Sequence, residues 1–123
     1  MKFTDGYWAM RPEYSPLYAV DIDDVRVDQT AGTLTVYAAT APLRTRGDVL
    51  NRPMITITYS SPAEGVITTR IVHHAGRRQL GPSFQLNRAD GFVPVVELGE
   101  AEAALHSGAL TVRVPRSGRW HAD

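Results

Sequence analysis

The chain has 123 residues, of which 43% are hydrophobic and 21% are charged, with no cysteine and a formal net charge of zero. These values allow one folded soluble domain, and they exclude disulfides, thiolate metal sites and the basic stripe that nucleic-acid binding requires. No stretch approaches the roughly 20 apolar residues of a membrane span. Because the N-terminus also lacks an apolar signal core, we expect a cytoplasmic protein with no nucleic-acid or membrane partner.

The first predicted strands show an irregularity in their apolar alternation. Apolar residues alternate over 18–22, and the alternation continues over 25–27 with the opposite parity. Since the side chains of a strand alternate strictly, this change of parity predicts a β-bulge at Asp23-Asp24. A turn at 28–32 then leads into a second alternating strand at 33–40.

The middle of the chain predicts three more strands. Two runs rich in β-branched residues, 54–60 and 66–74, are typical of strands. A third run, 92–98, contains Pro94. Proline cannot donate a hydrogen bond to a ladder, so we expect this strand at a sheet edge or at a bulge.

The segment 100–106 has the composition of a helix, but it lies close to the alternating strand 110–114. Ser107-Gly108 between them forms a good tight turn, so we predict a hairpin and not a helix. Seven strands at regular spacing, without a long helix, indicate an all-β chain folded as an antiparallel β-sandwich.

Two groups of polar residues resemble metal sites without meeting their requirements. His73 and His74 are adjacent and point to opposite faces of a strand, and the other two histidines are far away in the sequence. Asp21, Asp23 and Asp24 lack the glycine and the terminal glutamate of a calcium-binding loop. We therefore predict no metal site.

No catalytic or cofactor-binding motif is visible in the sequence. There is no glycine-rich phosphate loop, and none of the serines has the flanking glycines of a nucleophile elbow. We therefore predict no catalytic residue, no cofactor-binding residue and no cofactor.

Aromatic residues are the usual platform for sugar rings and also the usual plug at the end of a sandwich core. Four of them gather near the N-terminus: Tyr7, Trp8, Tyr14 and Tyr18. We favour the plug, with Trp8 and Tyr18 packed into the sandwich or against its end. Among the predicted strand residues, Tyr37 and Tyr59 are the candidate sugar-facing aromatics, and two are few for a sugar-binding face.

The order and density of several short stretches are more specific than any single motif. They are Met-Lys-Phe-Thr-Asp-Gly-Tyr-Trp at 1–8, Met10-Arg11-Pro12, Asp24-Val25-Arg26-Val27, Leu34-Thr35-Val36-Tyr37-Ala38, Arg46-Gly47-Asp48-x-Leu50-Asn51, Ser60-Ser61-Pro62-x-Glu64-Gly65-Val66-Ile67 and Ser107-Gly108-Ala109-Leu110-Thr111-Val112-Arg113-Val114. In this order they resemble the start of bacterial α-xylosidases of glycoside hydrolase family 31. The resemblance spans essentially the whole chain, and 77–102 is its least distinctive part.

The resemblance implies a fold and a role. The N-terminal domain of that family is a β-sandwich of the galactose-mutarotase-like supersandwich type, followed by a (β/α)₈ barrel that carries two catalytic aspartates for retaining hydrolysis. A barrel alone needs about 250 residues. We therefore expect residues 1–123 to be a partial, non-catalytic N-terminal domain, without the barrel. Its partners would be the parent's barrel and, through the parent, an α-xyloside of xyloglucan type.

Three alternatives remain open from the sequence: a free-standing carbohydrate-binding module, the N-terminal domain of an α-glucosidase, and a structural interaction domain without a ligand. A partial sandwich would also expose an unpaired edge. We expect this edge at strand 110–114, only partly protected by the charges of Arg113, Arg116 and Arg119. Self-association of the isolated chain through that edge is the expected consequence.

Overall fold

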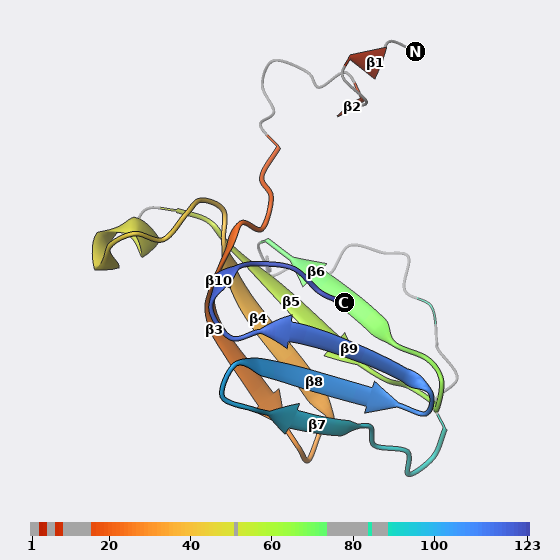
Figure 1. Cartoon of the computed structure of the whole chain (residues 1–123). Coiled ribbons are helices and arrows are strands. Elements are labelled where there is room, and N and C mark those ends of the chain that lie inside the picture. The colour runs from red at the N-terminus through yellow and green to blue at the C-terminus, as the bar shows by residue number, and fades with distance from the viewer. Residues whose placement is uncertain (1–2, 5–6, 9–15, 51, 74–83, 85–88) are drawn as a thin grey trace.

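The computed structural model describes residues 3–4, 7–8, 16–50, 52–73, 84 and 89–123, and its strands are all antiparallel (Figure 1). The described part contains one short 3₁₀ turn, η1 (Arg46–Val49), and a two-stranded ribbon of β1 (Phe3–Thr4) and β2 (Tyr7–Trp8). No helix in these residues is long or apolar enough to cross a membrane.

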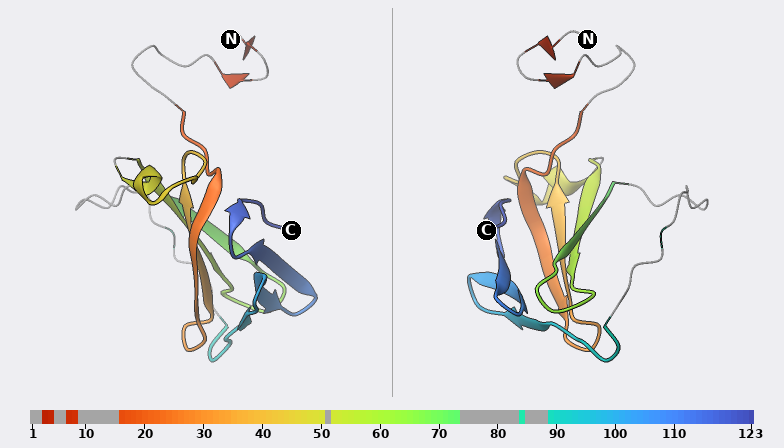
Figure 2. Two further views of the ribbon diagram at one scale, coloured as in Figure 1. Left: turned by 60° about the vertical axis from the view of Figure 1, so that its left-hand side comes forward. Right: turned by 90° about the vertical axis from the view of Figure 1, so that its right-hand side faces the viewer.

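The remaining strands form two sheets that face each other as separate layers (Figure 2). The five-stranded sheet has the order β10 (Gly118–Arg119), β3 (Asp21–Asp28), β4 (Thr33–Ala39), β5 (Met54–Ser60) and β6 (Thr68–Val72). The three-stranded sheet has the order β7 (Val95–Leu98), β8 (Glu102–Ser107) and β9 (Leu110–Pro115). The predicted all-β, antiparallel, sandwich-like arrangement is confirmed, and it is open on one side.

Most predicted strands agree with the observed ones. The run 54–60 has the predicted bounds, whereas 66–74 contains a shorter strand. Pro94 precedes β7, which starts at Val95 and lies at the edge of its sheet, as expected. Segment 100–106 contributes to a hairpin and not to a helix, as predicted. Because Ser107 pairs with Leu110, the two-residue loop of the hairpin is Gly108-Ala109, one residue later than the predicted turn.

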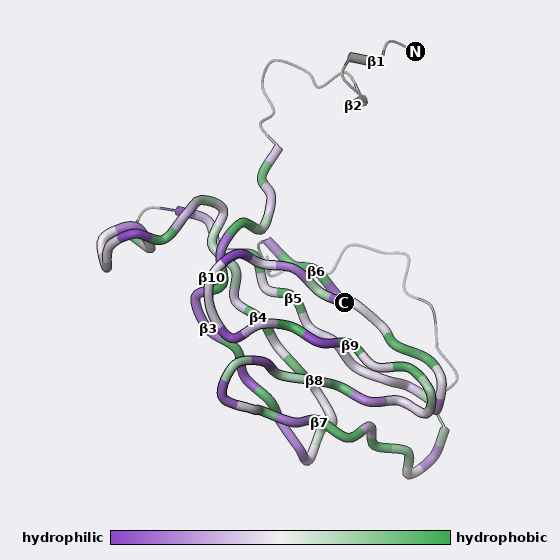
Figure 3. Tube along the Cα trace, in the orientation of Figure 1, coloured by the Kyte–Doolittle hydropathy of each residue, from purple (hydrophilic) through white to green (hydrophobic). Residues whose placement is uncertain are grey.

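The core lies between the inner faces of the two sheets, and polar residues alternate with the apolar ones along the strands (Figure 3). The buried hydrophobic residues that form it are Ile22, Val25, Leu34, Val36, Ala38, Ile55, Ile57, Tyr59, Val96, Ala103, Leu105 and Val114. On β4, Leu34, Val36 and Ala38 are completely buried, while the intervening residues point outward. Burial of such side chains is the main stabilising contribution to a fold of this size.

The predicted bulge is confirmed in β3. Ile22 pairs with Ala38, but the next partner of β4, Tyr37, pairs with Asp24, so Asp23 is the extra residue. Because the bulge reverses the parity of the strand, Ile22 and Val25 both face the core although an even number of residues separates them.

The predicted aromatic plug is not observed where the structure describes it. Tyr18 is 54% exposed, so it is not packed into the sandwich, and its packing against the end of the sandwich stays a prediction. The side chain of Trp8 lies outside the described residues.

One end of the sandwich is closed by a contact between the β3–β4 turn and the residues before β7. The side chain of Asp28 accepts hydrogen bonds from the N–H groups of Thr30 and Ala31, both at 2.9 Å, and so shapes the turn. Gly32 follows with φ of 61°, and a Cβ atom there would lie 2.5 Å from Cδ of Pro94. Glycine is required at this position both for its dihedral angle and for its small size.

The other end is closed by the C-terminal residues 118–123, which we call the clasp. Gly118 and Arg119 pair with the start of β3, and the N–H of Trp120 donates to the carbonyl of Val20 at 2.8 Å. The chain then reaches β9, where Asp123 and Arg113 exchange two backbone hydrogen bonds of 2.9 and 3.1 Å. The clasp therefore joins the two sheets. The expectation of an unpaired edge on strand 110–114 is wrong at Arg113, because Asp123 occupies that position.

Gly32→Ala should destabilise the fold more than Gly65→Ala. Both glycines have positive φ, so both variants strain the backbone, but a Cβ at Gly65 meets no atom within 4 Å. Only Gly32→Ala also forces a collision with Pro94, which adds about 1–3 kcal/mol to the loss of unfolding free energy. Urea denaturation of both variants measures the difference. Equal losses would show that the contact with Pro94 has little effect.

Trp120→Ala should destabilise the fold by about 2 kcal/mol or more, because the half-buried indole packs against the core. Trp120→Phe is the matched control. The buried Nε1 has no hydrogen-bond partner among the described residues, so its removal should cost little stability. Thermal unfolding of both variants checks this. A large loss in Trp120→Phe would instead reveal a partner for the indole N–H.

Candidate functional site

The first candidate surface is the loop between β4 and β5, residues 40–53, of which 51 is not described; it projects from one end of the five-stranded sheet (Figure 1). Its neck is closed by Thr40, whose hydroxyl donates to the carbonyl of Pro53 at 3.0 Å. Asp21, on β3, holds the loop by accepting a hydrogen bond of 2.8 Å from the N–H of Leu43. The loop is therefore fixed to the sheet at two points.

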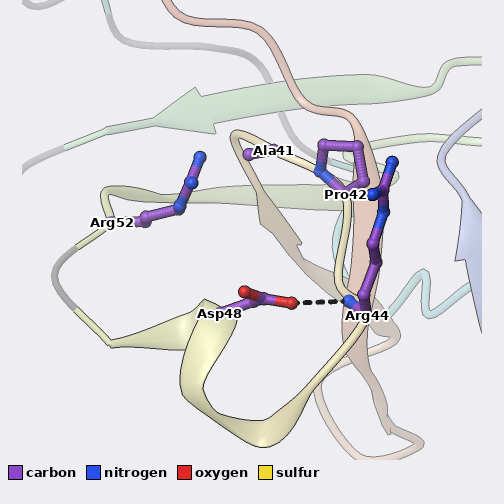
Figure 4. Close-up of a pocket in the computed structure, with 5 residues that line it drawn as sticks. All are labelled: Ala41, Pro42, Arg44, Asp48 and Arg52. Atoms are coloured by element: carbon purple, nitrogen blue, oxygen red, sulfur yellow. Dashed lines mark hydrogen bonds between the residues drawn. The ribbon is translucent and has the colours of Figure 1, made fainter.

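Asp48 shapes the projecting part of this loop (Figure 4). Its carboxylate accepts hydrogen bonds from the N–H groups of Arg44 at 2.8 Å and Thr45 at 2.7 Å, and so caps the 3₁₀ turn. These two backbone donors, Arg44 first, lower the pKa of Asp48 below its usual range, because they favour the charged form. The spacing Thr45-x-x-Asp48 is a capping pattern that the sequence already contains.

A shallow concavity of about 220 Å³ lies beside this turn, lined by Ala41, Pro42, Arg44, Asp48 and Arg52. Figure 4 shows the side chains of Arg44 and Arg52 extending from the two arms of the loop, with Pro42 and Ala41 between them. Leu50, next to the turn, is 70% exposed. Two guanidinium groups at this concavity, with an exposed leucine elsewhere on the same loop, are suited to contact with carboxylates, backbone carbonyls and apolar groups of another protein.

A second concavity, of about 420 Å³, lies on the outer face of the five-stranded sheet. It is lined by Ala31, Thr33, Thr58, Ser60, Ser61, Pro62, Thr68, Arg70 and Phe92. Sheet register explains how the hydroxyl groups come together, because Thr58 pairs with Arg70 and Ser60 pairs with Thr68. Hydroxyl groups, one guanidinium and one aromatic ring are the groups that contact polyhydroxylated ligands.

Ser61 has a structural role at the rim of this concavity. Its hydroxyl lies 2.8 Å from that of Ser107 on β8, and it donates to the carbonyl of Ala63 at 2.7 Å. The buried pair of serines connects the residues after β5 to the end of β8. A nucleophilic role is therefore not supported for either serine.

The two candidate sugar-facing tyrosines lie on opposite faces of the five-stranded sheet. Tyr59 belongs to the core and is 4% exposed, so it offers no ring face to a sugar, and burial raises the pKa of its phenol. Tyr37 lies on the outer face, where the guanidinium of Arg26 is 5.2 Å from the centre of its ring. Arg26 in turn pairs with Asp24 at 2.7 Å. Sugar binding by Tyr37 stays a prediction.

The residues considered as metal ligands do not converge. Asp21 binds the N–H of Leu43, whereas Asp24 pairs with Arg26. His73 is exposed, and His74 lies outside the described residues. Within the described part of the chain, no group of three or more histidine, aspartate or glutamate side chains could hold a metal ion.

Comparison with known proteins adds two relatives. No family model matches the chain. The sequence is 37% identical over 115 residues to the α-xylosidase XylQ of Lactiplantibacillus pentosus, an alignment that covers 94% of this chain. It is 29% identical over 114 residues, or 93% of this chain, to an α-xylosidase of Emericella nidulans. The chain spans only 15% and 14% of the lengths of these relatives.

The cap formed by Asp48 should depend on pH. Because its folded pKa is lowered, the carboxylate stabilises the loop fully above the unfolded-state value of about 3.9, and this contribution is lost as the pH falls through the folded pKa. NMR signals of the Arg44 and Thr45 amides should therefore shift as the pH falls below the unfolded-state value. The shift should vanish in Asp48→Asn. Amide signals in the unmodified chain that do not change with pH would contradict the cap.

Proposed function

We propose that this chain, which is related to α-xylosidases along nearly its whole length, is a non-catalytic N-terminal β-sandwich segment of such an enzyme. The similarity over 94% of the chain carries the proposal, and the small share of each relative that it covers fits a segment without the catalytic part. The parent protein would be a glycoside hydrolase of family 31. It would cleave α-xylosidic bonds of xyloglucan-type oligosaccharides, with retention of configuration, in the cytoplasm.

The arrangement of carboxylates supports a non-catalytic role. Retaining glycosidases need two carboxyl groups about 5–5.5 Å apart, one of which acts as a general acid with a raised pKa. The pKa of Asp48 is lowered, which is the opposite of what a general acid needs. Asp21 and Asp24 are held by the loop and by Arg26, so each is committed to a structural contact.

The projecting loop 40–53 is the part we assign to contact with the rest of the parent enzyme. Its shape is fixed by Asp21 and Asp48, so it meets a neighbouring domain without a large loss of conformational entropy. Arg44, Arg52 and the exposed Leu50 provide the charged and apolar groups of such a contact. In this role the segment braces the (β/α)₈ barrel and contributes to subunit contacts.

A carbohydrate-binding module is the second candidate function, and the hydroxyl-lined concavity on the outer sheet face favours it. A sugar there would pack on Phe92 and accept hydrogen bonds from Arg70. Titration of the chain with xyloglucan oligosaccharides would distinguish this function, because signals of Thr58, Ser60 and Thr68 would shift. The α-glucosidase alternative has less support, since both relatives are α-xylosidases.

Activity of three proteins tests the proposal: this chain alone, the L. pentosus enzyme without the matching stretch, and a chimera in which this chain replaces that stretch. We expect hydrolysis of p-nitrophenyl α-xyloside by the chimera alone, because the chain supplies the missing sandwich but no carboxyl pair. The unmodified enzyme is the positive control. An inactive chimera would contradict the proposal that this chain is the N-terminal segment of such an enzyme. Turnover by the chain alone that disappears on replacing one of its carboxylates would contradict the non-catalytic role.

A further inference from the structure

The strand β6 lies at the free edge of the five-stranded sheet. It pairs with β5 on one side, and no described strand pairs with its other side. The right-hand view of Figure 2 shows the three-stranded sheet, in blue, beside β3, and β6, in green, on the opposite side of the large sheet. The smaller sheet therefore leaves the inner face of β6 uncovered.

An apolar row of the core continues across the sheet to this edge. Register aligns Val25, Val36, Ile57 and Ile71 on neighbouring strands, so their side chains share the inner face. The first three are 6%, 0% and 1% exposed, whereas Ile71 is 63% exposed. The last residue of the row, Ile71 on β6, therefore lies outside the core, with its large apolar side chain in contact with water.

The backbone of Ile71 also faces the free edge. The carbonyl of Ala39 accepts a hydrogen bond from Val20, so the backbone groups of Ala39 point toward β3. Backbone groups alternate between the two sides of a strand, so those of Val36 point toward β5 and those of Ile57 toward β4. Ile57 pairs with Ile71, so the N–H and C=O of Ile71 point away from β5.

This edge lacks the features that usually prevent pairing between chains. β6 contains no proline, and its single charged residue, Arg70, is on the outer face, opposite to Ile71. On the other sheet, Asp123 already occupies the edge of β9 at Arg113. Among the described strands, the edge without a partner is therefore that of β6, and not that of the strand 110–114 expected from the sequence.

We propose that a second copy of the chain pairs with β6 through its own β6, antiparallel and about a two-fold axis at Ile71. Such an interface is self-complementary, and Ile71 would exchange both backbone hydrogen bonds with the partner subunit's Ile71. Arg70 would then lie opposite the partner subunit's Val72. Centring the pair on Arg70 would instead place two guanidinium groups opposite each other, which is unfavourable. The formal net charge of zero adds no repulsion between copies. The proposal concerns the chain by itself, and it is independent of the role proposed for loop 40–53.

Light scattering after size-exclusion chromatography, over a concentration series, tests the pairing. We expect a dimer whose association constant falls by about tenfold or more in Ile71→Lys, since two lysines would face each other at the axis. Leu50→Lys is the matched control, because Leu50 is 70% exposed on the distant loop. It should leave association unchanged. A monomer at every concentration would overturn the proposal, as would a dimer that survives Ile71→Lys.

A second variant tests the register and a second measurement tests the edge. Val72→Glu would face the partner subunit's Arg70, so it should strengthen association. Weaker association in Val72→Glu would overturn the two-fold axis at Ile71. Hydrogen exchange of the amides of Thr69 and Ile71 should slow as concentration rises. Protection that is already complete in dilute monomer would show that another part of the same chain covers β6, and would overturn the proposal.

Discussion

Burial of the inner face of β4 beneath β8 is the interaction on which the other features depend. Leu34, Val36 and Ala38 on β4 and Leu105 on β8 have no exposed surface. Because strand residues alternate, an apolar inner face leaves the outer face for threonine, serine and arginine. The bulge at Asp23 keeps both halves of β3 in phase with this core, and Asp21, which precedes the bulge, holds the projecting loop.

The fold could be predicted in large part because its main signals are local. The change in apolar parity along 18–27 predicts the bulge, Pro94 predicts an edge strand, and Ser107-Gly108 predicts a hairpin. The clasp could not be predicted, since its partners on β3 and β9 are set by tertiary packing. Tyr59 shows a different failure: it shares the parity of Ile55 and Ile57, so its inward orientation was visible in the sequence. An aromatic ring suits a sugar platform and a core equally well, so residue type alone does not decide between them.

The candidate sites also differ in whether their signals are local in the sequence. The cap at Asp48 has a local signature, whereas the hydroxyl-lined concavity is formed by residues of three strands and three connections that only the tertiary fold brings together. The surfaces of the chain are held rigidly by contacts within the chain itself. Loop 40–53 is fixed at its neck, and the carboxylates of Asp21 and Asp24 make structural contacts. The role proposed within an α-xylosidase rests on sequence similarity, because a fold alone does not define a function.

The clasp has a consequence for the order of events during protein synthesis. Residues 118–123 emerge from the ribosome long after the start of β3, with which they pair. At about 5–20 residues per second, the start of β3 has no partner from the clasp for roughly 5–20 s. The nascent sandwich therefore stays open at that end until translation has passed Asp123. During this interval the exposed edge of β3 is a site where a chaperone or a neighbouring nascent chain can bind.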